Sequence, residues 1–143
     1  MIVLDANILL YAYDSRTPLH QQTKSWLERS FSSVGLIGLP RQTIGAFLRI
    51  ATNTKLPGDR YSSTEAGDIV ESWLAVPSLV ILQPTDKFWK FLRETIINGQ
   101  AQGALITDAE LAALTISYGA TLATTDRDFA RFPGLRWLNP IAP

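Results

Sequence analysis

The 143-residue sequence contains no cysteine and only one histidine, His20, and these two shortages exclude several kinds of site. Without cysteine there is no disulfide scaffold, no thiolate metal site and no cysteine nucleophile. A single histidine also rules out metal sites that need two imidazole ligands. A metal ion bound by this chain must therefore rely mainly on oxygen ligands.

Charge is scarce and balanced: charged residues make up 18% of the chain, with 13 Lys and Arg against 13 Asp and Glu. No overall field attracts nucleic acid or an anionic membrane, so nucleic-acid binding requires a local basic patch. The low proportion of charged residues and the four tryptophans favour a homodimer. No apolar run approaches the ~18 residues of a membrane span, and no signal peptide precedes the first apolar segment. We therefore expect a cytoplasmic protein without membrane association.

Short apolar segments alternate with helical patterns, which predicts a single domain over residues 1–143. The expected strands are residues 2–4, 35–39, 79–82, 120–124 and, at an edge, 135–138. The expected helices are residues 18–31 and 41–52, and three that begin at Ser62–Glu65, Thr85–Asp86 and Thr107–Glu110. This order predicts an α/β fold, a three-layer α/β/α sandwich around a central parallel sheet of four to five strands. An all-helical bundle is the alternative.

Three aspartates are expected at one edge of that sheet. Strand 2–4 ends in Asp5, strand 120–124 ends close to Asp126, and Asp108 lies in the first turn of the helix before that strand. Ligands of open α/β sheets bind beyond the carboxyl ends of the strands. Three neighbouring carboxylates repel one another unless one is protonated or a cation binds, and oxygen ligands favour Mg²⁺ or Mn²⁺. Such a cluster suits phosphodiester hydrolysis by a metal-activated water.

Each of these acids also has a purely structural explanation. Asp5 can cap the turn after its strand, Asp108 can stabilise the N-terminus of its helix, and Asp126 and Asp128 can be ordinary loop acids. Asn7, two residues after Asp5, can hydrogen-bond to that carboxylate or to the nearby backbone. The sequence leaves both readings open.

Four basic residues lie close together in the middle of the chain: Arg41, Arg49, Lys55 and Arg60. They either contact the phosphates of a nucleic acid or form a solvated face. Arg49 directly follows Leu48 on the expected helix, which places it beside the acidic site or in a pair with one of its acids.

Four segments, in this order, resemble the motifs of PIN-domain ribonucleases, specifically VapC-type toxins of toxin–antitoxin pairs. They are Ile2–Asn7, with its hydrophobic strand and Asp-x-Asn, the Phe-Leu-Arg segment in 47–53, Thr107–Leu114, and the closing segment Gly119–Phe129. Each motif alone is weak. Together they cover nearly the whole chain at the spacing of that family.

The resemblance implies a PIN-like fold and a Mg²⁺-dependent endoribonuclease that a cognate antitoxin holds inactive. It implies that Asp5, Asp108 and Asp126 are the catalytic metal ligands, with Mn²⁺ as a possible substitute for Mg²⁺, and that Thr124 is the small hydroxyl residue beside them. It also implies a homodimer and structured RNA substrates such as tRNA, cut to leave a 5′-phosphate and a 3′-hydroxyl.

One departure from the family pattern concerns the helix after the second strand, where the family usually carries a Glu. This chain has no Asp or Glu between Glu28 and Asp59, and Ala46 stands in the expected place. The loss leaves open whether one or two metal ions bind, with Gln42 or a water as a substitute ligand. It also supports the alternative of a catalytically weak or inactive PIN-like binding or scaffold domain.

A second enzyme class, the aspartyl-phosphate phosphatases, also begins with a strand that ends in Asp. That class needs another Asp two residues later as a general acid. Here the position holds Asn7, whose amide cannot donate a proton in that role. This class therefore ranks well below the nuclease.

Overall fold

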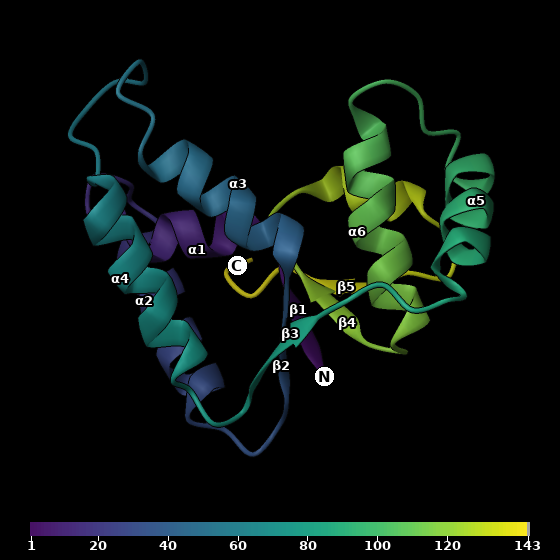
Figure 1. Cartoon of the computed structure of the whole chain (residues 1–143), viewed down its shortest axis with the longest axis horizontal. Coiled ribbons are helices and arrows are strands. Elements are labelled where there is room, and N and C mark those ends of the chain that lie inside the picture. The colour runs from purple at the N-terminus through teal and green to yellow at the C-terminus, as the bar shows by residue number, and fades with distance from the viewer. Residues whose placement is uncertain (143) are drawn as a thin grey trace.

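The computed structural model of the chain describes residues 1–142, which form a parallel sheet between two groups of helices (Figure 1). The strands are β1 (Ile2–Leu4), β2 (Ile37–Pro40), β3 (Leu79–Leu82), β4 (Thr121–Ala123) and β5 (Arg136–Leu138). The helices are α1 (Ala6–Ala12), α2 (His20–Phe31), α3 (Arg41–Ala51), α4 (Ser63–Leu74), α5 (Phe88–Asn98), α6 (Leu105–Ser117) and the short 3₁₀ helix η1 (Arg127–Arg131). Within these 142 residues no helix has the length and apolar character needed to cross a membrane.

The sheet has the strand order β3-β2-β1-β4-β5, and every neighbouring pair is parallel. This confirms the predicted α/β fold with a parallel sheet of five strands. The central strand β1 lies between β2 and β4, and its Leu4 is in register with Ala123 of β4. The residues that follow these two, Asp5 and Thr124, therefore emerge side by side at the same edge of the sheet.

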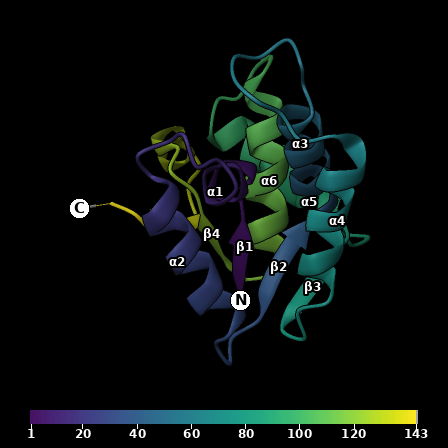
Figure 2. The same cartoon turned by 90° about the vertical axis from the view of Figure 1, so that its left-hand side faces the viewer.

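Alternate residues of the strands supply two separate hydrophobic cores. Leu4 and Ala123 pack on the face covered by α1 to α4, and Val3 and Leu122 pack on the face covered by α5, α6 and η1. Figures 1 and 2 show these two groups of helices on opposite sides of the strands. The three layers follow from this alternation, because a strand in a parallel sheet is buried on both faces.

The pattern of the sequence did not predict α1. Only Asp5 separates this helix from β1, and the helix is seven residues long. Its N-cap is Asp5, and Ile8 and Leu9 are fully buried. A helix of only seven residues carries little periodic signal, so its boundary depends on the cap alone.

Helix starts were predicted with mixed success. The capping box of Ser62 and Glu65 at the start of α4 is confirmed, with both reciprocal hydrogen bonds present. The predicted caps at Thr85–Asp86 and Thr107 are wrong, because α5 and α6 begin without a side-chain cap and Thr107 lies inside α6. Neither of these helix starts is therefore set by a side-chain cap.

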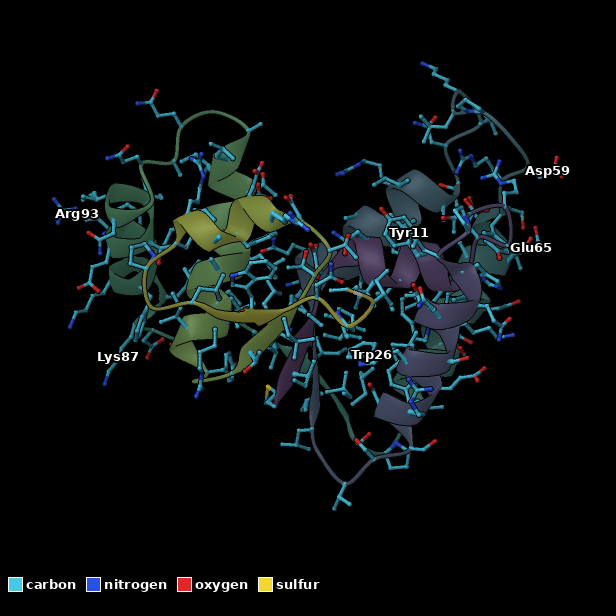
Figure 3. All side chains as sticks on the ribbon, turned by 180° about the vertical axis from the view of Figure 1, so that it is seen from behind. Tyr11, Trp26, Asp59, Glu65, Lys87 and Arg93 are labelled. Carbon is cyan, nitrogen blue, oxygen red and sulfur yellow. The ribbon has the colours of Figure 1, made fainter. Side chains whose placement is uncertain are left out.

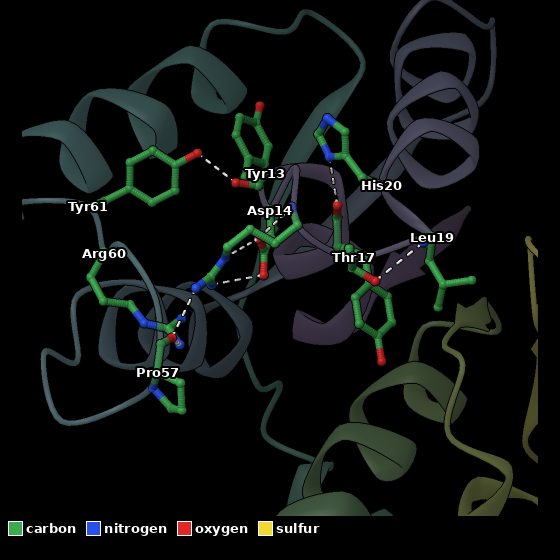
Figure 4. Close-up of polar contacts among 10 residues, drawn as sticks. Tyr13, Asp14, Thr17, Leu19, His20, Pro57, Arg60 and Tyr61 are labelled. Atoms are coloured by element: carbon green, nitrogen blue, oxygen red, sulfur yellow. Dashed lines mark hydrogen bonds and ion pairs between the residues drawn. The ribbon is translucent and has the colours of Figure 1, made fainter.

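The loop before α4 is fastened to the segment after α1 (Figure 4). Arg16 and Arg60 both donate hydrogen bonds to the Pro57 carbonyl, and Tyr61 donates one to the Tyr13 carbonyl at 2.6 Å. Arg60 was one of the four basic residues considered for phosphate binding. In the structure its guanidinium contributes to holding this loop.

The start of the α5–α6 loop packs closely against η1, and this contact gives a stability prediction. A methyl group on Gly99 would lie 2.4 Å from Cδ1 of Phe132 and 2.9 Å from the Thr95 carbonyl oxygen. Gly99→Ala therefore forces the Phe132 ring out of place, and we expect it to destabilise the fold by about 1–3 kcal/mol in urea unfolding. Gly67→Ala on α4, where no neighbouring atom lies within 4 Å of an added Cβ, is the matched control. Equal stability of the two variants would contradict the prediction.

Candidate active site

Asp5 stands at the end of β1 and is held by three hydrogen bonds. Its Oδ1 accepts from the Ala6 backbone N–H at 2.7 Å, which caps α1. Its Oδ2 accepts from Thr124 Oγ1 at 2.7 Å and from Asn7 Nδ2 at 3.1 Å. The capping role and the functional role are therefore compatible: one oxygen serves the helix, and the other faces the neighbouring strand.

Burial is the main influence on Asp5 and raises the pKa of its carboxyl. The hydrogen bonds from Thr124 and Ala6 favour the charged form and oppose this rise, while the negative charge of Asp126 adds to it. The carboxylate of Asp5 is thus close enough to Asp126 to interact with it. An ionised Asp5 in this place is costly without a positive partner.

Thr124 connects the end of β4 to the end of β1. Its fully buried hydroxyl donates to Asp5 and accepts from Asn7 Nδ2 at 3.2 Å and from the Asp126 backbone N–H at 3.0 Å. Asn7 completes the arrangement, because its Oδ1 accepts from the Thr125 N–H at 3.4 Å. One hydroxyl and one amide thereby fix Asp5 and the start of the Asp126 segment relative to each other.

The five buried threonines differ in whether their hydroxyl groups bond within their own helix or to the end of β1. Thr23, Thr95 and Thr115 donate to carbonyls four residues earlier in their own helices. Thr43 and Thr124 instead bond to the end of β1, at the Leu4 carbonyl (2.9 Å) and at Asp5. Family resemblance pointed to Thr124, but no signal in the sequence pointed to Thr43, because its partner lies 39 residues away.

The other two aspartates approach the same edge from α6 and η1. Asp108 is half-buried in the first turn of α6, and Asp126 is the N-cap of η1, where its Oδ1 accepts from the Asp128 N–H at 2.8 Å. Burial raises the pKa of Asp108, and the charges of Asp126, Asp5 and Asp128 raise it further, while Arg131 lowers it. Asp128, an ordinary loop acid on its sequence context, also acts on Asp108.

These carboxylates are close enough to influence one another, but they are too far apart to coordinate one metal ion together. Among residues 1–142, no three His, Cys, Asp or Glu side chains are arranged to hold a metal ion as they stand. The donor set nevertheless fits a hard divalent cation, because it consists of carboxylates that repel one another. Binding such an ion requires the carboxylates to move closer together.

The basic residues differ in how they relate to the acidic site. Arg49 is exposed in the last turn of α3, and the one ion pair in the described part of the chain joins Arg16 and Asp14. Arg131, at the end of η1, is the basic residue that acts on Asp108, and its Nη1 donates to the Gly99 carbonyl at 3.4 Å. Sequence reasoning overlooked Arg131, although it follows Asp126 by only five residues. Arg93 of α5 and Lys87, the N-cap of that helix, lie on the other side of the molecule from Asp59 and Glu65 (Figure 3).

The raised pKa of Asp108 predicts a gain in stability for Asp108→Asn. A raised pKa means that the folded chain binds this proton more tightly than the unfolded chain. Stability therefore falls as pH rises from the ordinary value of 3.8 through the raised value, and the full penalty remains above it. In EDTA at about pH 7 we expect Asp108→Asn to raise Tm by about 2 °C. The gain should vanish near the ordinary pKa, and the exposed Asp68→Asn should change little. An equal gain at both pH values would contradict the assignment.

Comparison with known proteins places the chain in a family. The PIN domain family model matches residues 2–135. Ribonuclease VapC37 of Mycobacterium tuberculosis is 34% identical over 142 residues, covering 99% of this chain and 99% of that protein. Ribonuclease VapC43 of the same species is 33% identical over 141 residues, covering 99% and 96%.

A solved structure with the same fold is VapBC2 from Rickettsia felis bound to a DNA fragment from its promoter. The TM-score is 0.72 at 20% identity, covering 97% of this chain and 98% of that one.

Proposed function

The chain belongs to the VapC family of PIN-domain ribonucleases, the toxins of toxin–antitoxin systems, and from this premise we propose that it cleaves RNA with one hard divalent cation, Mg²⁺ or Mn²⁺, held by Asp5, Asp108 and Asp126. The observation that carries the proposal is that acids from three distant segments come within electrostatic reach of one another at one edge of the sheet. The charge of Asp126 raises the pKa of the Asp5 carboxyl, and the charges of Asp126 and Asp5 raise the pKa of the Asp108 carboxyl.

The proposed roles follow from how each side chain is held. Asp5 is fixed by Thr124 and Asn7, so its carboxylate is a rigid anchor for a cation. Asp126 keeps one oxygen in the cap of η1, and its other oxygen has no hydrogen-bond donor among residues 1–142. Asp108 is free of such donors on both oxygens, so it can adjust its position. A bound Mg²⁺ would supply Lewis-acid stabilisation of charge on the phosphate and make a water molecule more acidic.

Positive charge for the RNA backbone is proposed to come from Arg131 and Arg49. Arg131 lies within electrostatic reach of Asp108, and Arg49 is exposed and unpaired in the described structure. Arginine beside a reacting phosphate offsets the negative charge that develops during in-line attack. Of the two, Arg131 is the better placed, because it belongs to the segment that follows Asp126.

The direct test is to incubate the purified protein with RNA in Mg²⁺, in Mn²⁺ and in EDTA. We expect cleavage with either metal and none in EDTA, with products that carry 5′-phosphates and 3′-hydroxyls. Absence of metal-dependent cleavage across a panel of structured RNAs, tRNA included, would contradict the proposal.

We further propose a cognate antitoxin as the protein partner. Structural neighbours of this chain include a toxin–antitoxin complex from Klebsiella pneumoniae. An antitoxin that inserts a basic side chain among Asp5, Asp108 and Asp126 would relieve the same repulsion that a cation relieves. Antitoxin and Mg²⁺ are then expected to compete for one site.

We also propose that the chain forms a homodimer. Several large apolar side chains are exposed on the single chain, among them Trp89 (66%) and Ile97 (57%) on α5 and Val80 and Ile81 on the edge strand β3. Their burial between two copies would remove apolar surface from water. Light scattering at micromolar concentration should give about twice the 15.8 kDa chain mass, and a monomer throughout that range would contradict this.

A further inference from the structure

Asp108 differs from the other acids of the site because nothing holds its side chain directly. In the described structure its carboxylate accepts no hydrogen bond, whereas Asp5 accepts three. The start of α6 also lacks a side-chain cap, because its N-cap residue is Ala104. The position of Asp108 therefore depends on what holds the first turn of α6.

One side chain from the opposite helical layer reaches that turn. Gln42 Nε2 donates a hydrogen bond to the Thr107 carbonyl oxygen at 3.3 Å, which joins the start of α3 to the residue before Asp108. The two residues are 65 positions apart in sequence. Figure 1 shows α3 and α6 on opposite sides of the strands, so this contact spans the edge where the acids gather.

The start of α3 is itself fixed to the site. Pro40, the last residue of β2, is followed directly by α3, and Thr43 donates its buried hydroxyl to the Leu4 carbonyl, next to Asp5. Gln42 therefore extends from a turn that is anchored beside Asp5 toward the turn that carries Asp108. The route from Leu4 through Thr43 and Gln42 to Thr107 connects the two acids without using a charged group.

The negative charges around Asp108 make the hydrogen bond from Gln42 more important for its position. No Asp or Glu occurs between Glu28 and Asp59, so α3 brings no carboxylate to the site. Its side chain at this place is a neutral amide that donates to backbone. Repulsion from Asp126, Asp5 and Asp128 favours movement of Asp108 away from the others, and the Gln42 hydrogen bond is made to the residue directly before Asp108.

We propose that Gln42 is a positioning residue, which braces the first turn of α6 against α3 and so keeps Asp108 within reach of a cation shared with Asp5 and Asp126. The consequence for the cation rests on the proposed function, but the brace itself does not. Gln42 does not need to touch the metal or the RNA. Its effect passes through Thr107 to Asp108.

The experiment compares Gln42→Met, which keeps the length of the side chain and removes the donor, with the wild-type protein. Gln21→Met, on the exposed surface of α2, is the matched control. Hydrogen exchange of the metal-free proteins reports on the brace. We expect amides in residues 104–111 to exchange about fivefold faster in Gln42→Met, because one hydrogen bond of ordinary strength is lost. Exchange in α4 should be unchanged.

Metal binding and kinetics provide the second readout. We expect the Mn²⁺ affinity of Gln42→Met to fall about tenfold, the range seen when a side chain that orients a metal ligand is removed. The Mg²⁺ concentration for half-maximal RNA cleavage should rise by a similar factor, while kcat at saturating Mg²⁺ stays within about twofold.

The outcomes separate the two proposals. Unchanged exchange in residues 104–111 overturns the brace, and faster exchange with unchanged Mn²⁺ affinity overturns its positioning role. If the wild-type protein neither binds Mn²⁺ nor cleaves RNA, the proposed function fails, whereas the exchange comparison still decides whether Gln42 holds the turn.

Discussion

Asp5→Asn is expected to lower metal-dependent RNA cleavage by about a thousandfold or more, because it removes the charge of the most firmly held carboxylate. The substitution keeps the size of the side chain. Its remaining carbonyl oxygen can still accept from the Ala6 N–H, so the cap of α1 is retained. The new amide, however, meets the Nδ2 donor of Asn7, which weakens that contact.

Initial cleavage rates over a range of Mg²⁺ concentrations measure this effect. The unfolding temperature, recorded in parallel, shows whether the variant is folded. Asp86→Asn, at an exposed position before α5, is the matched control and should cleave like the wild type. A folded Asp5→Asn protein that keeps a tenth or more of the wild-type rate would contradict the assigned role.

Thr124→Val should lower both stability and cleavage, because it removes the hydroxyl that joins β1 to β4. Valine has nearly the same shape, so the loss is one of hydrogen bonding. The variant leaves Asn7 Nδ2 and the Asp126 N–H without this acceptor and leaves Asp5 without its closest side-chain donor. Unsatisfied buried groups of this kind cost about 1–3 kcal/mol, and loss of an orienting partner costs about 10–100-fold in activity.

Thr115→Val separates the two effects of Thr124→Val. Thr115 is also fully buried, but its hydroxyl bonds only to the Leu111 carbonyl within α6. We expect a smaller loss of stability and an unchanged cleavage rate for the folded protein. If Thr124→Val and Thr115→Val cleaved RNA equally well, Thr124 would have no role beyond packing.

The sequence was sufficient for the parts of the fold that local patterns determine. Short apolar runs marked the strands, and the abrupt change from apolar residues to Asp5 marked the end of β1. Because parallel strands end at one edge, Asp5 and Asp126 were expected to be neighbours, and the register of Leu4 with Ala123 explains why the two segments meet.

Local sequence patterns could not predict the contacts between residues that are distant in the chain. Thr43 and Gln42 act on partners 39 and 65 residues away, and Arg131 acts on Asp108 through the packing of η1 against the α5–α6 loop. No local spacing encodes such pairs. Helix α1 was missed for a different reason, since its seven residues are too few to show a clear helical period.

Crystals grown or soaked with Mn²⁺ test the central claim most directly, because the ion gives an anomalous signal that locates it independently of activity. The account predicts one peak per chain at the edge of the sheet, with carboxylate oxygens of Asp5, Asp108 and Asp126 drawn around it and the peak absent in Asp5→Asn. A structure in saturating Mn²⁺ with no ion among these three side chains would contradict it.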